Sequence, residues 1–210
     1  MPAGLVAIAA GTAGMVELHF SSALNPVTGV ISDYFYSPHG WLLPVSLIAI
    51  AAGAGLLALV LARAGGDRRI TVLLGIWAAA IFLVGAFPTD QPGAPLSMSG
   101  GIHRYAAFVA FMVMPAAGLL VAGRTPWPRP VRAMSVTAYA ALAVVVVPYV
   151  TVMLGHGPVG LPQGLTQRVV VAAEIGLLVV LARYAREVLG AADRVAEHVP
   201  ADRVGVADGG

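Results

Sequence analysis

Six stretches of mostly apolar residues alternate with short polar segments along the chain. A helix that crosses a bilayer needs about 20 consecutive, predominantly apolar residues. Each stretch is therefore predicted to be one transmembrane helix, and the fold class is predicted to be an all-α integral membrane bundle. The predicted spans cover approximately residues 3–20, 41–63, 70–87, 102–123, 131–154 and 166–189.

The arginines orient this bundle. Ten of the twelve lie on one predicted side of the membrane, at the ends of spans or in the segments after the second, fourth and sixth spans. Short cytoplasmic segments of membrane proteins are enriched in arginine and lysine. Both termini are therefore predicted to be cytoplasmic, and segments 21–40, 88–101 and 155–165 are predicted to face outward. Only Arg104 and Arg168 lie at the outer end. The ten are Arg63, Arg68, Arg69, Arg124, Arg129, Arg132, Arg183, Arg186, Arg194 and Arg203.

The composition agrees with a multi-pass protein of the cell membrane. Of 210 residues, 59% are hydrophobic and only 10% are charged, with a mean hydropathy of +0.86. Residues 1–189 are predicted to form one transmembrane domain in contact with the lipid bilayer, and residues 190–210 a flexible cytoplasmic tail. The net charge of +2 follows from the arginines that flank the spans, so nucleic acid is not an expected partner. The chain has no cysteine, which excludes disulfides and thiolate metal sites.

Two carboxyl groups lie within predicted spans. Glu17 is about one turn inside the outer end of the first span, and Glu174 is seven residues, about two turns, below Gln167. An ionisable group at membrane depth is costly and is expected to face the interior of the bundle. Burial favours the neutral acid, which can donate a proton. The alternatives are a Glu17 side chain that reaches the membrane surface and a Glu174 side chain that only joins two helices.

Polar residues also gather at the outer helix ends. Asp90 follows Phe87-Pro88-Thr89, His103 opens the fourth span, and Gln167 and Arg168 open the sixth. Asp90 is a candidate acid or base, or else the ion-pair partner of an outer arginine. Glu17, Asp90, His103 and Glu174 are the candidate catalytic residues. Glu17, Asp90, His103 and Gln167 are expected to converge in one chamber near the outer surface.

Histidines and aromatic residues accompany this group. His19, His39, His103 and His156, with Asp33 and Asp90, offer zinc ligands, but no metal-binding signature connects them. No metal and no cofactor are therefore predicted. Outer aromatic residues are typical of an interfacial belt, and some are expected to line the chamber. The candidate substrate-binding residues are His19, Asp33, Tyr34, Trp41, Phe87, Tyr105, Tyr149, Gln167 and Arg168.

Several of these elements together resemble a known family. The pattern consists of Asn25-Pro26, Ser32-Asp33-Tyr34, Gly40-Trp41, Phe87-Pro88-Thr89-Asp90, Gly101-x-His103 and Gln167-Arg168. It is similar to the bacterial membrane family catalogued as domain of unknown function 998 and covers residues 5–189. The resemblance implies a six-helix bundle and highlights Asp33, Asp90, His103, Gln167 and Arg168. It implies no established activity, and Glu17 and Glu174 are not part of its pattern.

A looser similarity, of role and not of motif, is to small integral-membrane terpene cyclases, which use buried carboxylic acids to protonate an epoxide or alkene. The leading hypothesis is an integral-membrane enzyme that acts on a lipophilic small molecule by acid–base chemistry, in the form of proton-initiated cyclisation of an isoprenoid. The alternatives are a proton-coupled or small-molecule transporter, a zinc-dependent membrane hydrolase and a non-catalytic assembly protein. The sequence leaves the substrate and the oligomeric state open.

Overall fold

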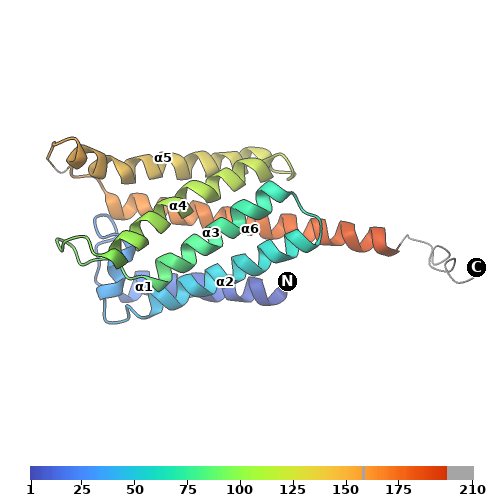
Figure 1. Cartoon of the computed structure of the whole chain (residues 1–210), viewed down its shortest axis with the longest axis horizontal. Coiled ribbons are helices and arrows are strands. Elements are labelled where there is room, and N and C mark those ends of the chain that lie inside the picture. The colour runs from blue at the N-terminus through green and yellow to red at the C-terminus, as the bar shows by residue number, and fades with distance from the viewer. Residues whose placement is uncertain (158, 198–210) are drawn as a thin grey trace, which may run out of the picture.

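The structure, a computed structural model, describes residues 1–157 and 159–197 and contains six helices long and apolar enough to cross a membrane. The predicted all-helical membrane bundle is thereby confirmed. A short 3-10 helix, η1 (Ile31–Tyr36), lies between the first two spans. The start of α1 and the described end of α6 lie at the same end of the bundle (Figure 1). The spans are α1 (Pro2–Ser21), α2 (Leu42–Arg63), α3 (Arg68–Ala86), α4 (Met98–Ala122), α5 (Pro128–Met153) and α6 (Gln163–Glu197).

Local chemistry explains where the helices begin. The Asp67 carboxylate accepts hydrogen bonds from the backbone N–H groups of Arg69 and Ile70, and so caps α3. Ser97 caps α4 in the same way through the N–H of Gly100, so α4 begins before the expected residue 102. Pro128 opens α5, where its missing N–H has no cost.

The sixth helix is longer than the sequence pattern suggested. It runs from Gln163 to Glu197, so residues 190–197, which we expected to belong to a flexible tail, continue the helix. Apart from Gly190, this segment consists of Ala, Asp, Arg, Val and Glu and contains no proline. At 1.5 Å per residue its 35 residues span roughly 50 Å, well beyond the roughly 30 Å hydrocarbon core. Residues 198–210 lie outside the described part of the chain.

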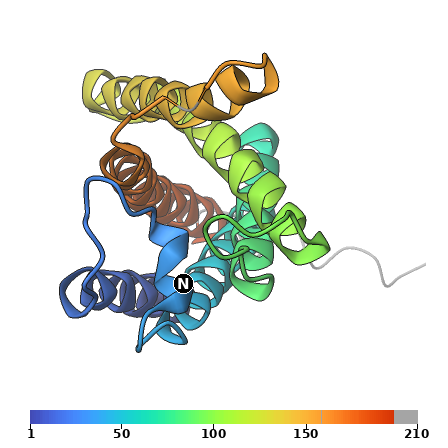
Figure 2. The same cartoon turned by 90° about the vertical axis from the view of Figure 1, so that its left-hand side faces the viewer.

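Consecutive helices pack side by side, and α6 also contacts α2 and α4. Small residues let α1 approach α2 closely, since a Cβ on Gly11 would lie 2.4 Å from the carbonyl oxygen of Ser46. The interior contains large side chains that are fully buried, among them Leu43, Leu74 and Met114. The end of the bundle that carries η1 is called the outer end, since the arginines predict that it faces outward. Viewed from this end, the segment between α1 and α2, with η1, lies between α6 and the α1–α2 pair (Figure 2).

Candidate functional site

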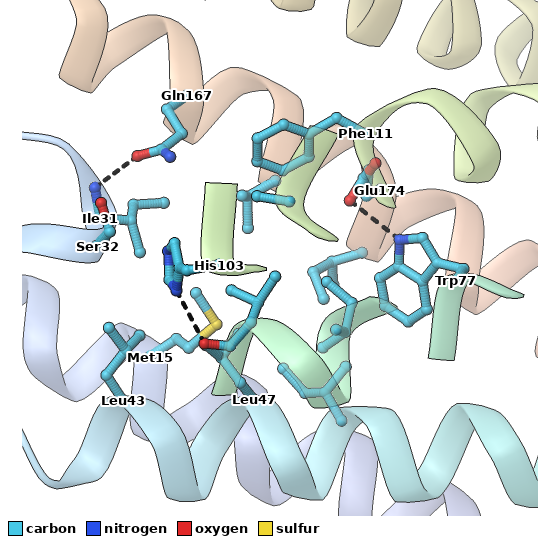
Figure 3. A pocket seen from close by; sticks show the side chains of 16 residues that line it. Met15, Ile31, Ser32, Leu43, Leu47, Trp77, His103, Phe111, Gln167 and Glu174 are labelled. Atoms are coloured by element: carbon cyan, nitrogen blue, oxygen red, sulfur yellow. Dashed lines mark hydrogen bonds between the residues drawn. The ribbon is translucent and has the colours of Figure 1, made fainter. Parts of the chain in front are cut away.

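A cavity of about 60 Å³ lies in the outer half of the bundle, between α1, α2, α3, α4, α6 and η1. Most of its lining is apolar, and the side chains of Ser32, His103, Gln167 and Glu174 add polar groups (Figure 3). Its volume holds a few water molecules and is far below the roughly 300–1,000 Å³ of pockets for drug-sized ligands. The cavity is therefore an apolar chamber with a small number of polar groups along its length.

Glu174 is the deepest polar group of this cavity. The residue is 2% exposed, and Oε2 of its carboxyl accepts a hydrogen bond of 3.2 Å from the indole Nε1 of Trp77. Its other oxygen, Oε1, is buried and has no hydrogen-bond partner among the described residues. Trp77, on α3, is itself 2% exposed, so the contact between α3 and α6 is shielded from solvent. A carboxyl in this setting retains unused hydrogen-bonding capacity.

One ring nitrogen of His103 is hydrogen-bonded to the part of the protein that the structure describes, and the other is not. Its Nδ1 lies 3.0 Å from the carbonyl oxygen of Val84 and 2.9 Å from that of Phe87, both at the end of α3. Carbonyl oxygens only accept hydrogen bonds, so Nδ1 must carry the proton. In the neutral ring Nε2 is then an acceptor, and no hydrogen bond to it occurs within the described chain. His103 lines the cavity and can act there as a base.

The segment before and within η1 closes the cavity at its outer end and is called the roof, and Gln167 and Arg168 bind to it. Oε1 of Gln167 accepts a hydrogen bond of 2.6 Å from the backbone N–H of Ile31 in η1. Arg168 donates to the carbonyl oxygens of Pro26, at 3.0 Å, and Gly29, at 2.7 Å. Ile31 and Ser32 line the cavity, so these bonds fasten the segment that closes it.

Tyr34 and His19 complete this roof. The hydroxyl of Tyr34 accepts a hydrogen bond of 2.8 Å from Nη2 of Arg168, whose guanidinium also lies 5.6 Å from the centre of the Tyr34 ring. Nδ1 of His19 lies 3.2 Å from the same hydroxyl. Asp33 accepts a hydrogen bond from the N–H of Val30, and burial raises the pKa of its carboxyl despite that bond and the nearby charge of Arg168. None of the three lines the cavity.

Asp90 lies outside the cavity and organises the connection between α3 and α4. Its carboxylate accepts a hydrogen bond of 3.1 Å from the backbone N–H of Ser97. Hydrogen bonds from Ser97 lower the pKa of Asp90 below its ordinary value, and the charge of Arg104 acts in the same direction. Within the described residues Asp90 forms no close ion pair, so the ion-pair alternative for it is wrong. The close approach of Gly100 explains why a side chain is absent there, since a Cβ would lie 1.8 Å from Oδ2 of Asp90.

Glu17 also lies outside the cavity, and the expectation that it faces the interior is wrong. The residue is exposed on the surface of α1, because the opposite face of this helix, with Gly11 and Leu18, packs on the bundle. The predicted single chamber therefore contains His103, Gln167 and Glu174, and excludes Glu17 and Asp90.

The outer aromatic residues lie mainly on the surface. Trp41 is 65% exposed, Tyr105 71% and Tyr149 50%, as an interfacial belt requires. Phe87 contributes its backbone carbonyl to His103. None of these four side chains lines the cavity.

The candidate zinc ligands do not converge. Among the described residues there is no group of three or more His, Asp or Glu side chains that could hold a metal ion. His19 is at the roof, and His103 uses its Nδ1 for backbone carbonyls. The zinc alternative therefore lacks a ligand set in residues 1–157 and 159–197.

Sequence reasoning missed Trp77 and Phe111. Both line the cavity, and Trp77 makes the hydrogen bond that orients Glu174. A signal for Trp77 was present, since it lies in the middle of its span, far from the membrane surface where tryptophan is usually found. No comparable signal marked Phe111 among the other apolar residues of α4.

Comparison with known proteins places the chain in a family of membrane proteins. A family model described as "Protein of unknown function (DUF998)" matches residues 3–184. No curated protein and no solved structure matches the chain.

Proposed function

Since the chain belongs to the family described as "Protein of unknown function (DUF998)", whose description names no activity, we infer its function from the geometry of the cavity. We propose that the protein is an integral-membrane enzyme that rearranges a lipophilic substrate by proton transfer. In this proposal Glu174 is the general acid and His103 is the general base.

The observation that carries the proposal is the unpartnered Oε1 of Glu174. A buried carboxylate with no cation beside it is strongly disfavoured, so this group is held as a neutral acid. A neutral acid in an apolar cavity has a proton to give and few competing acceptors. The rings of Trp77 and Phe111 in the same wall provide faces that stabilise a developing cation.

His103 supplies the complementary group. Because its Nδ1–H is committed to two carbonyl oxygens, Nε2 carries a lone pair and accepts a proton. A proton from Glu174 adds to one atom of the substrate, and a proton from another atom goes to His103. His103 then releases its proton to water and Glu174 takes one up from water, which returns the enzyme to its starting state. The substrate and product then have the same composition, so the reaction is an isomerisation and consumes no cofactor. Proton-initiated cyclisation of an isoprenoid is the intramolecular form of this reaction.

The size of the cavity constrains the substrate. About 60 Å³ admits the end of a chain and not a whole isoprenoid. Phe111 lines the cavity and belongs to one buried cluster with Leu142, a residue of α5 that lines the surface between α4 and α5. We therefore propose that the reacting end of the substrate enters while its tail remains in the bilayer.

The experiment is a comparison of lipid extracts from host cells that lack the gene and express the wild-type or a variant protein. The wild type is expected to convert one lipophilic compound into an isomer of equal mass. Purified protein in vesicles, given the unlabelled compound in deuterium oxide, should yield product with one added deuterium, because the Glu174 proton derives from water. Glu174→Gln keeps the side-chain shape and an acceptor for Trp77 but has no acid proton, so it should abolish the conversion.

Glu17→Gln is the matched control, since Glu17 is on the membrane-facing surface of α1 and lies outside the cavity. It should leave conversion unchanged. If cells with the Glu174→Gln protein, at equal protein level, still convert the compound into its isomer as the wild type does, the proposed role of Glu174 is overturned. A wild-type extract identical to that of cells without the gene would overturn the enzyme proposal itself.

A further inference from the structure

A second hollow, on the outer surface of the bundle, lies between α4 and α5. It has a volume of about 380 Å³ and is open to the membrane. Figure 1 shows α4 and α5 close together at the inner end and apart toward the outer end. We call this hollow the α4–α5 groove. Its lining residues are Phe108, Met112, Tyr139, Leu142, Ala143, Val146, Val147, Val150 and Thr151.

The groove has the depth and the chemistry for one lipid chain. It runs from near the middle of both helices toward the outer end, where α4 begins and α5 ends. From Arg104 to Met112 the helix rises about 12 Å, close to the roughly 15 Å thickness of half a hydrocarbon core. The two hydroxyl groups of the lining are occupied, since Tyr139 donates to the carbonyl of Met112 and Thr151 to that of Pro148. The remaining surface is apolar.

An arginine stands at the outer mouth of this groove. Arg104 is one turn above Phe108 on α4, and its guanidinium lies 5.4 Å from the ring centre of Tyr149 on α5. It forms no hydrogen bond and no salt bridge with any described residue, and its interaction with Asp90 is of longer range. Arg168, the other outer arginine, is fully engaged in the roof of the cavity.

This arrangement needs an explanation, because outer segments are depleted of cations. A guanidinium that spans two helices, with its donors free, is suited to a phosphate, which accepts paired hydrogen bonds from arginine. The apolar groove directly below accommodates an aliphatic chain. A zwitterionic lipid such as phosphatidylcholine would fill the groove equally well, but its own ammonium group offsets the charge of its phosphate, so it suits the Arg104 charge less than an anionic lipid does.

We propose that the α4–α5 groove is a binding site for an anionic phospholipid of the outer leaflet. One acyl chain lies along Phe108 and Met112, and the phosphate lies at Arg104. The site is separate from the buried cavity and does not depend on the proposed enzymatic role. The site holds a lipid at Arg104. Of the two outer arginines, Arg168 is bonded within the described chain and Arg104 is not.

The test uses the full-length protein in phosphatidylcholine vesicles that contain a trace of photoactivatable phospholipid with a diazirine in its acyl chain. Phosphatidylglycerol and phosphatidylcholine probes with the same chains are compared, and crosslinked peptides are mapped by mass spectrometry. The wild type should crosslink the phosphatidylglycerol probe in residues 108–112 and 139–151 several-fold more than the phosphatidylcholine probe, because only the latter carries an ammonium group that offsets the attraction of its phosphate to Arg104.

Arg104→Gln should reduce this preference to near unity, while Arg104→Lys should retain part of it. Arg129→Gln is the control, since Arg129 is an exposed arginine at the inner end of α5. It should leave groove crosslinking unchanged. Equal crosslinking of both probes in the wild type would show only unselective bilayer lipid, and would overturn the proposal. A preference that survives Arg104→Gln would also overturn it.

Discussion

Trp77 donates its indole N–H to Oε2 of Glu174 at 3.2 Å, and so joins α3 to α6 in the interior of the membrane domain. The bond fixes one carboxyl oxygen and leaves Oε1 without a partner among the described residues. Two buried side chains from distant parts of the sequence thus create both a helix contact and the deepest polar group of the cavity. The relationship leads directly to the first prediction.

Trp77→Phe should weaken the bundle, because it removes the donor to Oε2 and leaves a second unpaired oxygen. Hydrogen bonds between transmembrane helices contribute about 0.6 kcal/mol on average and up to roughly 1.7 kcal/mol. The coupling free energy between Trp77→Phe and Glu174→Met is expected in this range, measured by unfolding of the four proteins in detergent. A coupling free energy of zero would mean that the bond contributes nothing.

Gly100→Ala should destabilise the protein. A Cβ at this position would lie 1.8 Å from Oδ2 of Asp90, so the α3–α4 connection must shift, at a cost of about 1–3 kcal/mol. Gly101→Ala is the matched control, since a Cβ there meets nothing within 4 Å and alanine favours a helix. The unfolding free energies of both variants check this, and equal values would contradict the packing described.

The Asp90 carboxylate should make stability depend on pH in the acid range. Hydrogen bonds from Ser97 lower the pKa of Asp90 in the folded protein below its ordinary value of 3.8. The stabilisation is therefore present above pH 3.8 and is lost as the pH falls through the lower, folded-state pKa. Asp90→Asn should give a flatter profile of the unfolding free energy below pH 3.8. Parallel profiles for the two proteins would contradict the assignment.

Arg168 should control access to the cavity from the outer end. Arg168→Gln removes donors to the carbonyl oxygens of Pro26 and Gly29 and to the hydroxyl of Tyr34. The native chain has no cysteine, so a single Ser32→Cys substitution reports on the roof alone. Its reaction with a water-soluble thiol reagent should become several-fold faster with Arg168→Gln. A cysteine at Met98, which is 82% exposed, should react equally fast in both backgrounds.

The sequence predicted the spans because their signal is local: about 20 apolar residues are enough to identify a membrane helix. Of the side chains expected in one chamber, His103 and Gln167 line the cavity, and Glu174 joins them because it lies on the same helix face as Gln167. The error at Glu17 has a physical reason. The face that α1 buries is determined by small residues such as Gly11, and apolar residues occur on both faces of a membrane helix.

The polar contacts between segments could not be predicted. The bond from Ile31 to Gln167 and that from Trp77 to Glu174 join residues that lie far apart in the chain. Asp90 belongs to the motif that resembles the family, yet its contacts with Ser97 and Gly100 at the start of α4 could be seen only in the structure. Spacing identifies such residues as important without distinguishing a structural role from a chemical one.

The orientation of the bundle remains a prediction from the arginines, and cysteine labelling tests it. A membrane-impermeant thiol reagent applied to intact cells should modify Gln91→Cys, in the exposed segment between α3 and α4. It should not modify Pro126→Cys, in the exposed turn between α4 and α5, until the cells are opened. The reverse pattern would mean that the start of α1 and the described end of α6 face the outside of the cell.

The most direct test of the central claim is the infrared spectrum of the purified protein in lipid at pH 7. A neutral carboxyl group gives a C=O stretching band that a carboxylate lacks. The wild type should show this band for Glu174, and the band should be absent in Glu174→Gln and retained in Glu17→Gln. If Glu174→Gln removes only carboxylate absorption, compared with the wild type, then Glu174 is ionised in the wild type. That result would contradict its role as a proton donor.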